Sequence, residues 1–197
     1  MTQPLHIFSF SGSLRKASTN TRLLRIIQST MLPDSVTMEI FDLTPLPLYN
    51  PDVESEGFPQ PVQEFRQKIA QADAILIACP EYNYSVTSAL KSALDWASRP
   101  PKDAGPDARQ PLNAKPLGIV GGGGRAGSTR AQLHLRQIAT YLNMYPINQP
   151  EVLINNIRQQ FDDNGEFTDQ AALGFMRQHV ENLVSWTRHL KASQVPA

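Results

Sequence analysis

The sequence lacks the features that mark several classes of protein. It holds one cysteine in 197 residues, Cys79, so no internal disulfide can form and nothing indicates an oxidising compartment. Its 18 Lys and Arg residues balance 18 Asp and Glu residues, which leaves no excess positive charge to attract DNA or RNA. No stretch approaches the roughly 18 apolar residues of a membrane span, and no basic segment followed by a long apolar run opens the chain. We therefore expect a cytoplasmic protein that binds neither nucleic acid nor membrane.

Metal-binding and P-loop motifs are missing as well. The four histidines are scattered without metal-ligand spacing, so no metal site is expected. The Gly-x-x-x-x-Gly-Lys-Ser/Thr string of P-loop proteins does not occur. Cys79 ends an apolar run, where a buried, unreactive thiol is a more common finding than a redox-active one.

Short apolar runs alternate along the chain with segments of helical periodicity. The apolar runs predict five strands, at 5–10, 36–41, 74–79, 117–120 and 152–154. The periodic segments predict five helices, around 23–27 and over 62–70, 85–97, 130–142 and 169–190. This alternation is typical of βαβ units. We expect a single domain over 1–197, an α/β flavodoxin-like three-layer sandwich with a five-stranded parallel sheet and helices on both faces.

Two proline-rich segments, 44–61 and 98–116, interrupt the alternation. The second is much longer than the usual connection of about 4–6 residues. Loops of this length are functional lids, interface arms or disordered segments, and composition does not decide among them.

The loop after the first predicted strand, 11–21, indicates an anion site. Ligands of an open parallel sheet bind beyond the carboxyl ends of its strands. The loop leads into a helix, whose first N–H groups and dipole attract an anion, and the Arg15 guanidinium matches phosphate oxygens. On these residues alone, a phosphate cradle and a plain helix start capped by Ser18 and Asn20 are equally good interpretations.

The loops after the third and fourth predicted strands fall on the same edge. Segment 80–85 combines two tyrosines with an amide and can hold a planar ring, or can be a proline turn whose tyrosines pack on their neighbours. Segment 121–124 is four glycines, which let a ligand approach the backbone closely or form a flexible turn. Because all three unusual loops share one edge, a ligand site there is favoured.

These residues resemble the NADPH-dependent FMN reductase family, in the branch that includes bacterial quinone and chromate reductases. The resemblance covers about 5–183 and rests on matching motifs at Gly12–Arg15 with Ser18 and Asn20, at Pro80–Asn83, at Leu90–Trp96 and at Arg130–Arg136. Two segments depart from the family pattern: 98–116 is longer and richer in proline, and 121–128 holds a longer glycine run.

The resemblance implies a flavodoxin-like FMN-binding domain and assigns roles to the three loops. The FMN phosphate would be held by Ser13, Arg15, Ser18, Asn20 and Thr21. The ribityl chain and isoalloxazine ring would lie against Pro80, Glu81, Tyr82, Asn83, Tyr84 and Ser85. The other side of the ring would be bordered by Gly122, Gly123 and Arg125.

The resemblance also implies an enzyme, an NAD(P)H-dependent FMN reductase or quinone reductase. Hydride would pass from NADPH or NADH, via FMN, to a quinone, a free flavin, an azo compound or an oxyanion such as chromate, in ping-pong order. Because the cofactor carries the chemistry, no catalytic residue is expected. The small-molecule electron acceptor would be its partner, and a homodimer or homotetramer its assembly.

Two other functions fit the same fold. A flavodoxin-type electron carrier would bind FMN and pass single electrons to proteins, but such carriers are typically acidic and this chain has no net charge. A binding module that has lost its cofactor would not need Ser13, Arg15, Ser18 and Asn20 together.

Overall fold

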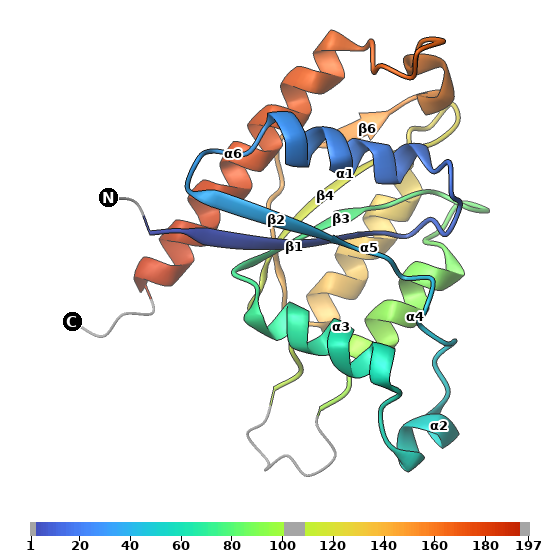
Figure 1. Cartoon of the computed structure of the whole chain (residues 1–197), viewed down its shortest axis with the longest axis vertical. Coiled ribbons are helices and arrows are strands. Elements are labelled where there is room, and N and C mark those ends of the chain that lie inside the picture. The colour runs from blue at the N-terminus through green and yellow to red at the C-terminus, as the bar shows by residue number, and fades with distance from the viewer. Residues whose placement is uncertain (1–2, 101–108, 194–197) are drawn as a thin grey trace.

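A twisted parallel sheet forms the middle layer of the computed structural model, which describes residues 3–100 and 109–193 (Figure 1). Its strands run in the order β2-β1-β3-β4-β5, with β6 also paired to β4, and each paired couple is parallel. The four longer strands are β1 (Leu5–Ser11), β2 (Val36–Phe41), β3 (Ala74–Ala78) and β4 (Pro116–Gly122). The carboxyl ends of β1, β3 and β4 therefore meet at one edge, as the sequence predicts.

The fifth position of the sheet is shared by two short strands. β5 (Tyr145–Pro146) pairs with the start of β4, and β6 (Val152–Ile154) pairs with its end. The predicted five-stranded parallel sheet is confirmed, with one strand more. β5 was not expected, because two residues that include a proline carry no hydrophobic period.

Helices cover both faces of the sheet (Figure 1). One face is covered by α1 (Thr19–Thr30) and α6 (Gln170–Ser193). The other is covered by α3 (Gln60–Gln71), α4 (Ser88–Ala97) and α5 (Thr129–Tyr141). Within the described ranges, no helix combines the length and the apolar character that a membrane crossing needs.

Each face of the sheet has its own buried core. Along β3, Leu76 packs into the core under α1 and α6, whereas Ile75 and Ile77 pack into the core under α3, α4 and α5. The second core contains an aromatic cluster in which the rings of Phe10 and Phe65 meet edge to face at 5.2 Å. Because the central strands are buried on both faces, their sequences are unbroken runs of apolar residues.

Two segments differ from the expected elements. The segment 44–61 contains a short helix, α2 (Pro51–Glu56), which begins with a proline behind the Asn50 cap. Helix α4 begins at Ser88, three residues later than expected, because 82–85 forms a tight turn instead. Of the second proline-rich segment, 98–116, residues 101–108 lie outside the described ranges, and its role stays a prediction.

Candidate functional site

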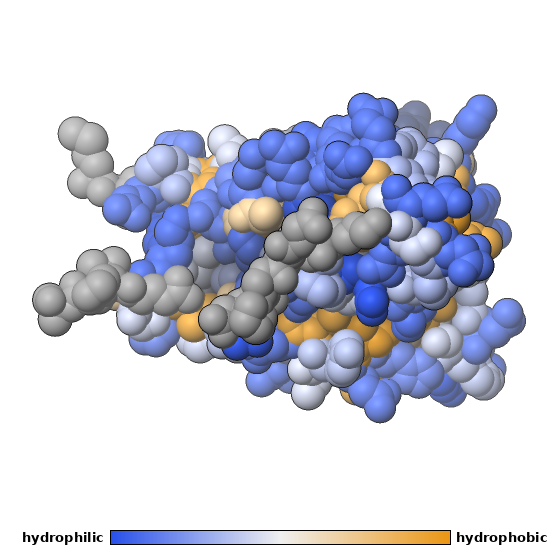
Figure 2. All heavy atoms as spheres, turned by 90° about the horizontal axis from the view of Figure 1, so that it is seen from below, coloured by the Kyte–Doolittle hydropathy of each residue, from blue (hydrophilic) through white to orange (hydrophobic). Residues whose placement is uncertain are grey.

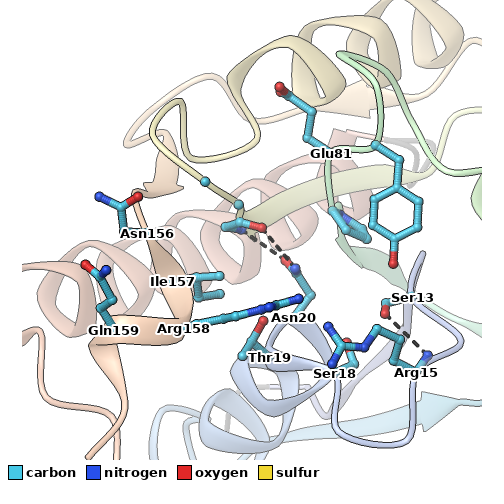
Figure 3. A pocket seen from close by; sticks show the side chains of 15 residues that line it. Ser13, Arg15, Ser18, Thr19, Asn20, Glu81, Asn156, Ile157, Arg158 and Gln159 are labelled. Carbon is cyan, nitrogen blue, oxygen red and sulfur yellow. Dashed lines mark hydrogen bonds between the residues drawn. The ribbon is translucent and has the colours of Figure 1, made fainter.

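A cavity of about 380 Å³ lies at the carboxyl edge of the sheet (Figure 3). Four segments line it: residues of 13–20 at the start of α1, residues 80–82 after β3, residues 122–124 at the end of β4, and residues 156–159 after β6. Three of the four are the loops that the sequence indicates. The volume lies within the range of about 300–1,000 Å³ that is usual for small-molecule and cofactor sites.

The first wall of the cavity is the loop that enters α1. Ser18 caps the helix, with its Oγ accepting a hydrogen bond from the Thr21 N–H at 3.1 Å, and it also lines the cavity. The exposed Arg15 lines the cavity beside it, and its N–H donates to Ser13 Oγ at 3.4 Å. Capping and anion binding are therefore compatible here, because the first N–H groups of the helix remain without intrahelical partners.

Asn20 joins α1 to the end of β4. Its Nδ2 donates to the Gly122 carbonyl and its Oδ1 accepts from the Gly122 N–H, both at 3.0 Å (Figure 3). The side chain is buried, and both ends of its amide are occupied by the backbone of the glycine segment. Asn20 thus positions the cavity wall at Gly122.

The glycine segment is held by hydrogen bonds to the chain that follows β6. Gly123 N–H donates to the Ile154 carbonyl at 3.1 Å, and Ile157 N–H donates to the Gly123 carbonyl at 3.0 Å. A Cβ at Gly122 would lie 2.5 Å from Ile157 Cδ1, so close packing requires a glycine there. A Cβ at Gly124 would meet nothing within 4 Å, which leaves the backbone open to a ligand.

The segment after β3 contains a tight turn. Tyr82 and Ser85 exchange two backbone hydrogen bonds of 3.0 Å, and Asn83 and Tyr84 between them have φ of 51° and 66°. Two successive left-handed residues are typical of a type I′ turn, an uncommon conformation for tyrosine. The Arg130 guanidinium stacks on the Tyr84 ring at 4.0 Å and covers its face.

Glu81 connects this segment to α5. Its Oε2 accepts from the N–H groups of Arg130 and Ala131 at 2.9 and 3.2 Å, and its Oε1 lies 3.6 Å from Arg130 Nη1. The carboxylate therefore points away from the cavity and neutralises the positive end of α5 (Figure 3). The negative charge of Glu81 therefore stabilises the start of α5, while other atoms of the residue line the cavity.

Residues 5–159 match the sequence profile of the NADPH-dependent FMN reductase family. The chain belongs to this family. It is 41% identical over 192 residues to an NAD(P)H-dependent FMN reductase of Pseudomonas aeruginosa, a match that covers 97% of this chain and all of that protein. It is 42% identical over 193 residues to an NADPH:quinone oxidoreductase of Arabidopsis thaliana, covering 95% and 94% of the two chains.

A solved structure of similar fold is that of the flavoenzyme NAD(P)H:(acceptor) oxidoreductase FerB from Paracoccus denitrificans. It superposes with a TM-score of 0.81 at 27% identity, over 94% of this chain and 98% of that one. The expected family, flavodoxin-like fold, enzyme class and FMN and NAD(P)H dependence are thereby confirmed.

The cavity fits the FMN that the FMN reductase family implies. Hydroxyls, a guanidinium and a helix start suit a phosphate, and the open backbone at Gly124 suits a ring. Of the residues expected to hold FMN, the cavity is lined by Ser13, Arg15, Ser18, Asn20, Pro80, Glu81, Tyr82, Gly122 and Gly123. Five others lie outside its lining: Thr21, Asn83, Tyr84, Ser85 and Arg125. Their contact with the cofactor stays a prediction.

Two of those five residues have other surroundings. Thr21 lines a second hollow of about 680 Å³ beside β2, and Ser85 Oγ lies 3.0 Å from His134 Nδ1. The cavity lining also contains Thr19 and Gly124, which belong to two of the predicted loops but were not among the residues expected to hold FMN. Segment 156–159, which includes Arg158, was not predicted at all. Segment 156–159 follows the carboxyl end of the parallel strand β6, which is the same signal that marks the other three cavity segments.

Cys79 lies at the end of β3, directly before the cavity loop, and is fully buried. Burial raises the pKa of its thiol to about 12, and the negative charge of Glu81 adds to this effect. The thiol therefore stays protonated and unreactive at neutral pH.

Proposed function

We propose that this FMN reductase family member transfers hydride from NAD(P)H to a quinone, with FMN held in the cavity between α1 and the end of β4. The observation that carries the proposal is the convergence of a free guanidinium, a helix start and an open glycine backbone on one cavity. The naming of the Arabidopsis relative as an NADPH:quinone oxidoreductase supports the choice of acceptor. Free flavin, azo compounds and chromate stay predictions.

The residues of the chain bind and orient the cofactor. Arg15 and the start of α1 would neutralise the phosphate, and the hydroxyl groups of Ser13 and Ser18 would donate hydrogen bonds to it. The Gly123–Gly124 backbone and Tyr82 would border the flavin. FMN, when bound, supplies the acceptance and release of hydride. No side chain of the cavity is assigned a role as obligatory acid, base or nucleophile.

An anaerobic visible spectrum of the purified protein, loaded with FMN if colourless, tests the proposal. We expect NADPH or NADH to bleach the flavin bands and a quinone to restore them. Bound flavin that neither nucleotide bleaches would contradict the proposal and favour an electron carrier. A protein that binds no flavin would refute the assignment of the cavity.

The same proposal includes a homodimer or homotetramer in the cytoplasm. Helix α5 exposes Leu133 and Tyr141, the latter at 87%. Hydrophobic residues also lie exposed among hydrophilic ones on the side of the molecule seen in Figure 2. A single buried cysteine fits a reducing compartment. Light scattering after size-exclusion chromatography tests the assembly, since a monomer at micromolar concentration would contradict it. Cell fractionation tests the location.

A further inference from the structure

A second arginine reaches into the cavity from the segment after β6. Arg158 belongs to the 3₁₀ helix η1 (Ile157–Gln160) and lines the cavity. Its side chain extends toward Thr19 and Asn20 at the start of α1, whereas Arg15 lies on the opposite side of Ser18 (Figure 3). Two guanidinium groups from distant parts of the chain thus flank one helix start.

The backbone that carries Arg158 is fixed to the cavity wall. Asn156 N–H donates to the Gly124 carbonyl at 2.8 Å, and Ile157 N–H donates to the Gly123 carbonyl at 3.0 Å. The Ile157 side chain is buried against Gly122. The backbone of Arg158 is therefore fixed beside the glycine segment that is expected to face the flavin. Only the side-chain torsions of Arg158 must be ordered when a ligand binds.

No carboxylate of the described residues neutralises Arg158. None of the ion pairs and side-chain hydrogen bonds found in the described ranges involves its guanidinium. Glu81 is the one acidic residue of the cavity lining, and its carboxylate is bound to the start of α5. The cavity lining thus holds two arginines and no carboxylate that is free to neutralise them. Its positive charge therefore strongly favours an anionic ligand.

We propose that Arg158 is a second binding residue for the FMN phosphate, opposite Arg15. A phosphate monoester carries up to two negative charges and three terminal oxygens, so it can accept from two guanidinium groups and from the helix N–H groups at once. The inference rests on the proposed function, because it needs FMN in this cavity. It assigns to η1 a part in cofactor retention that the three sequence-derived loops do not include.

The substitution Arg158→Gln tests the inference because it removes the charge and keeps an unbranched polar side chain, although a shorter one. We expect the Kd of the apoprotein for FMN, measured by quenching of flavin fluorescence, to rise about 10-fold or more, as for loss of a charge-assisted contact. The Kd for riboflavin, which lacks the phosphate, should stay within about 2-fold, so riboflavin also reports whether the variant is folded. The Kd of Arg158→Lys for FMN should lie between those of the wild type and Arg158→Gln, because lysine keeps the charge but lacks the forked pair of donors.

A matched control is Arg177→Gln in α6, which removes the same charge at an exposed position remote from the cavity lining. It should leave both Kd values unchanged. Equal FMN affinity in wild type and Arg158→Gln would overturn the inference, and so would an equal loss for FMN and riboflavin. An unchanged Kd for FMN with a raised KM for NADPH would overturn it too and assign Arg158 to the dinucleotide. Wild-type protein that binds no flavin would instead refute the proposed function.

Discussion

Individual residues at the cavity divide into those whose side chains face the open cavity and those that hold its wall. Asn20 belongs to the second group, because both ends of its amide bond the Gly122 backbone. Arg15 belongs to the first, since its exposed guanidinium lines the cavity without an ion-pair partner among the described residues. Substitutions of the two should therefore have different effects, on the fold at Asn20 and on affinity at Arg15.

The change Arg15→Ala should weaken FMN binding by about 1.5–3 kcal/mol, or roughly 10- to 150-fold in Kd, because a charge-assisted phosphate contact is lost. Titration of the apoprotein with FMN measures it. Lys16→Ala is the matched control, since Lys16 carries the same charge next in the chain but does not line the cavity. A similar loss in both variants would show a general effect of charge and contradict a direct contact.

His179 makes the stability of the fold depend on pH. Its Nε2 accepts from the Ile119 N–H at 3.0 Å and its Nδ1 donates to the Pro150 carbonyl at 2.8 Å, so the buried ring is neutral. Burial lowers its pKa to about 4, against about 6.5 in the unfolded chain. The unfolded state therefore binds more protons between these two pH values, and the free energy of unfolding should fall by up to about 3 kcal/mol as pH drops through them.

Urea unfolding at pH 7 and at steps down to pH 4 measures this fall. His179→Gln should be less stable at pH 7 but should lose this part of the pH dependence. His189→Gln, at an exposed position in the same helix, should keep it. An unaltered pH dependence in His179→Gln would contradict the assignment.

At the scale of elements, Glu81 links the loop after β3 to α5. Glu81→Gln should lower the free energy of unfolding by about 1–2 kcal/mol, because a carboxylate at a helix start is replaced by a neutral amide. Urea denaturation measures the difference. Glu64→Gln is the control, since its pair with Lys68 spans 4.0 Å at the surface and should change stability by less than about 0.5 kcal/mol. Equal losses in the two variants would contradict a capping role.

The sequence predicts the elements that have a strong period and misses those that do not. All four longer strands and the five helices α1, α3, α4, α5 and α6 lie where apolar spacing indicates them. By contrast, α2, β5 and η1 have only six, two and four residues, too few to show a period. The predicted start of α4 at residue 85 was wrong, because Ser85 instead closes the turn at 82–85 through two backbone hydrogen bonds with Tyr82.

The same distinction applies to the site. The place of Ser13, Arg15 and Ser18 in the cavity lining was predictable, because they lie in a motif between a strand and a helix that resembles a known family pattern. Arg158 was not predicted, because it follows the shortest predicted strand, 152–154, in a segment that has no glycine cluster and no family motif. Hydrogen bonds to Gly123 and Gly124 hold this segment at the cavity. They join chain positions about 30 residues apart, so no local sequence pattern reveals them.

At the scale of the whole molecule, the two cores share one sheet and should unfold together as a single domain. Trp96 is buried in α4 on one face, and Trp186 packs in α6 on the other. In each of Trp96→Phe and Trp186→Phe, the remaining tryptophan reports on one face, while far-ultraviolet circular dichroism reports on the entire chain. The two signals should give the same urea midpoint within each variant. Separate midpoints would contradict the single domain.

The division of the fifth sheet position between β5 and β6 bears on aggregation. An edge strand with a long row of unpaired N–H and carbonyl groups is a template on which another chain can add a strand. Here that edge consists of two residues, one of them Pro146, and then three more after an interval of five. Such a broken edge offers no continuous row to a second chain. Growth into fibrils by strand addition is therefore blocked on this side of the sheet, and β2 is the edge along which it would have to start.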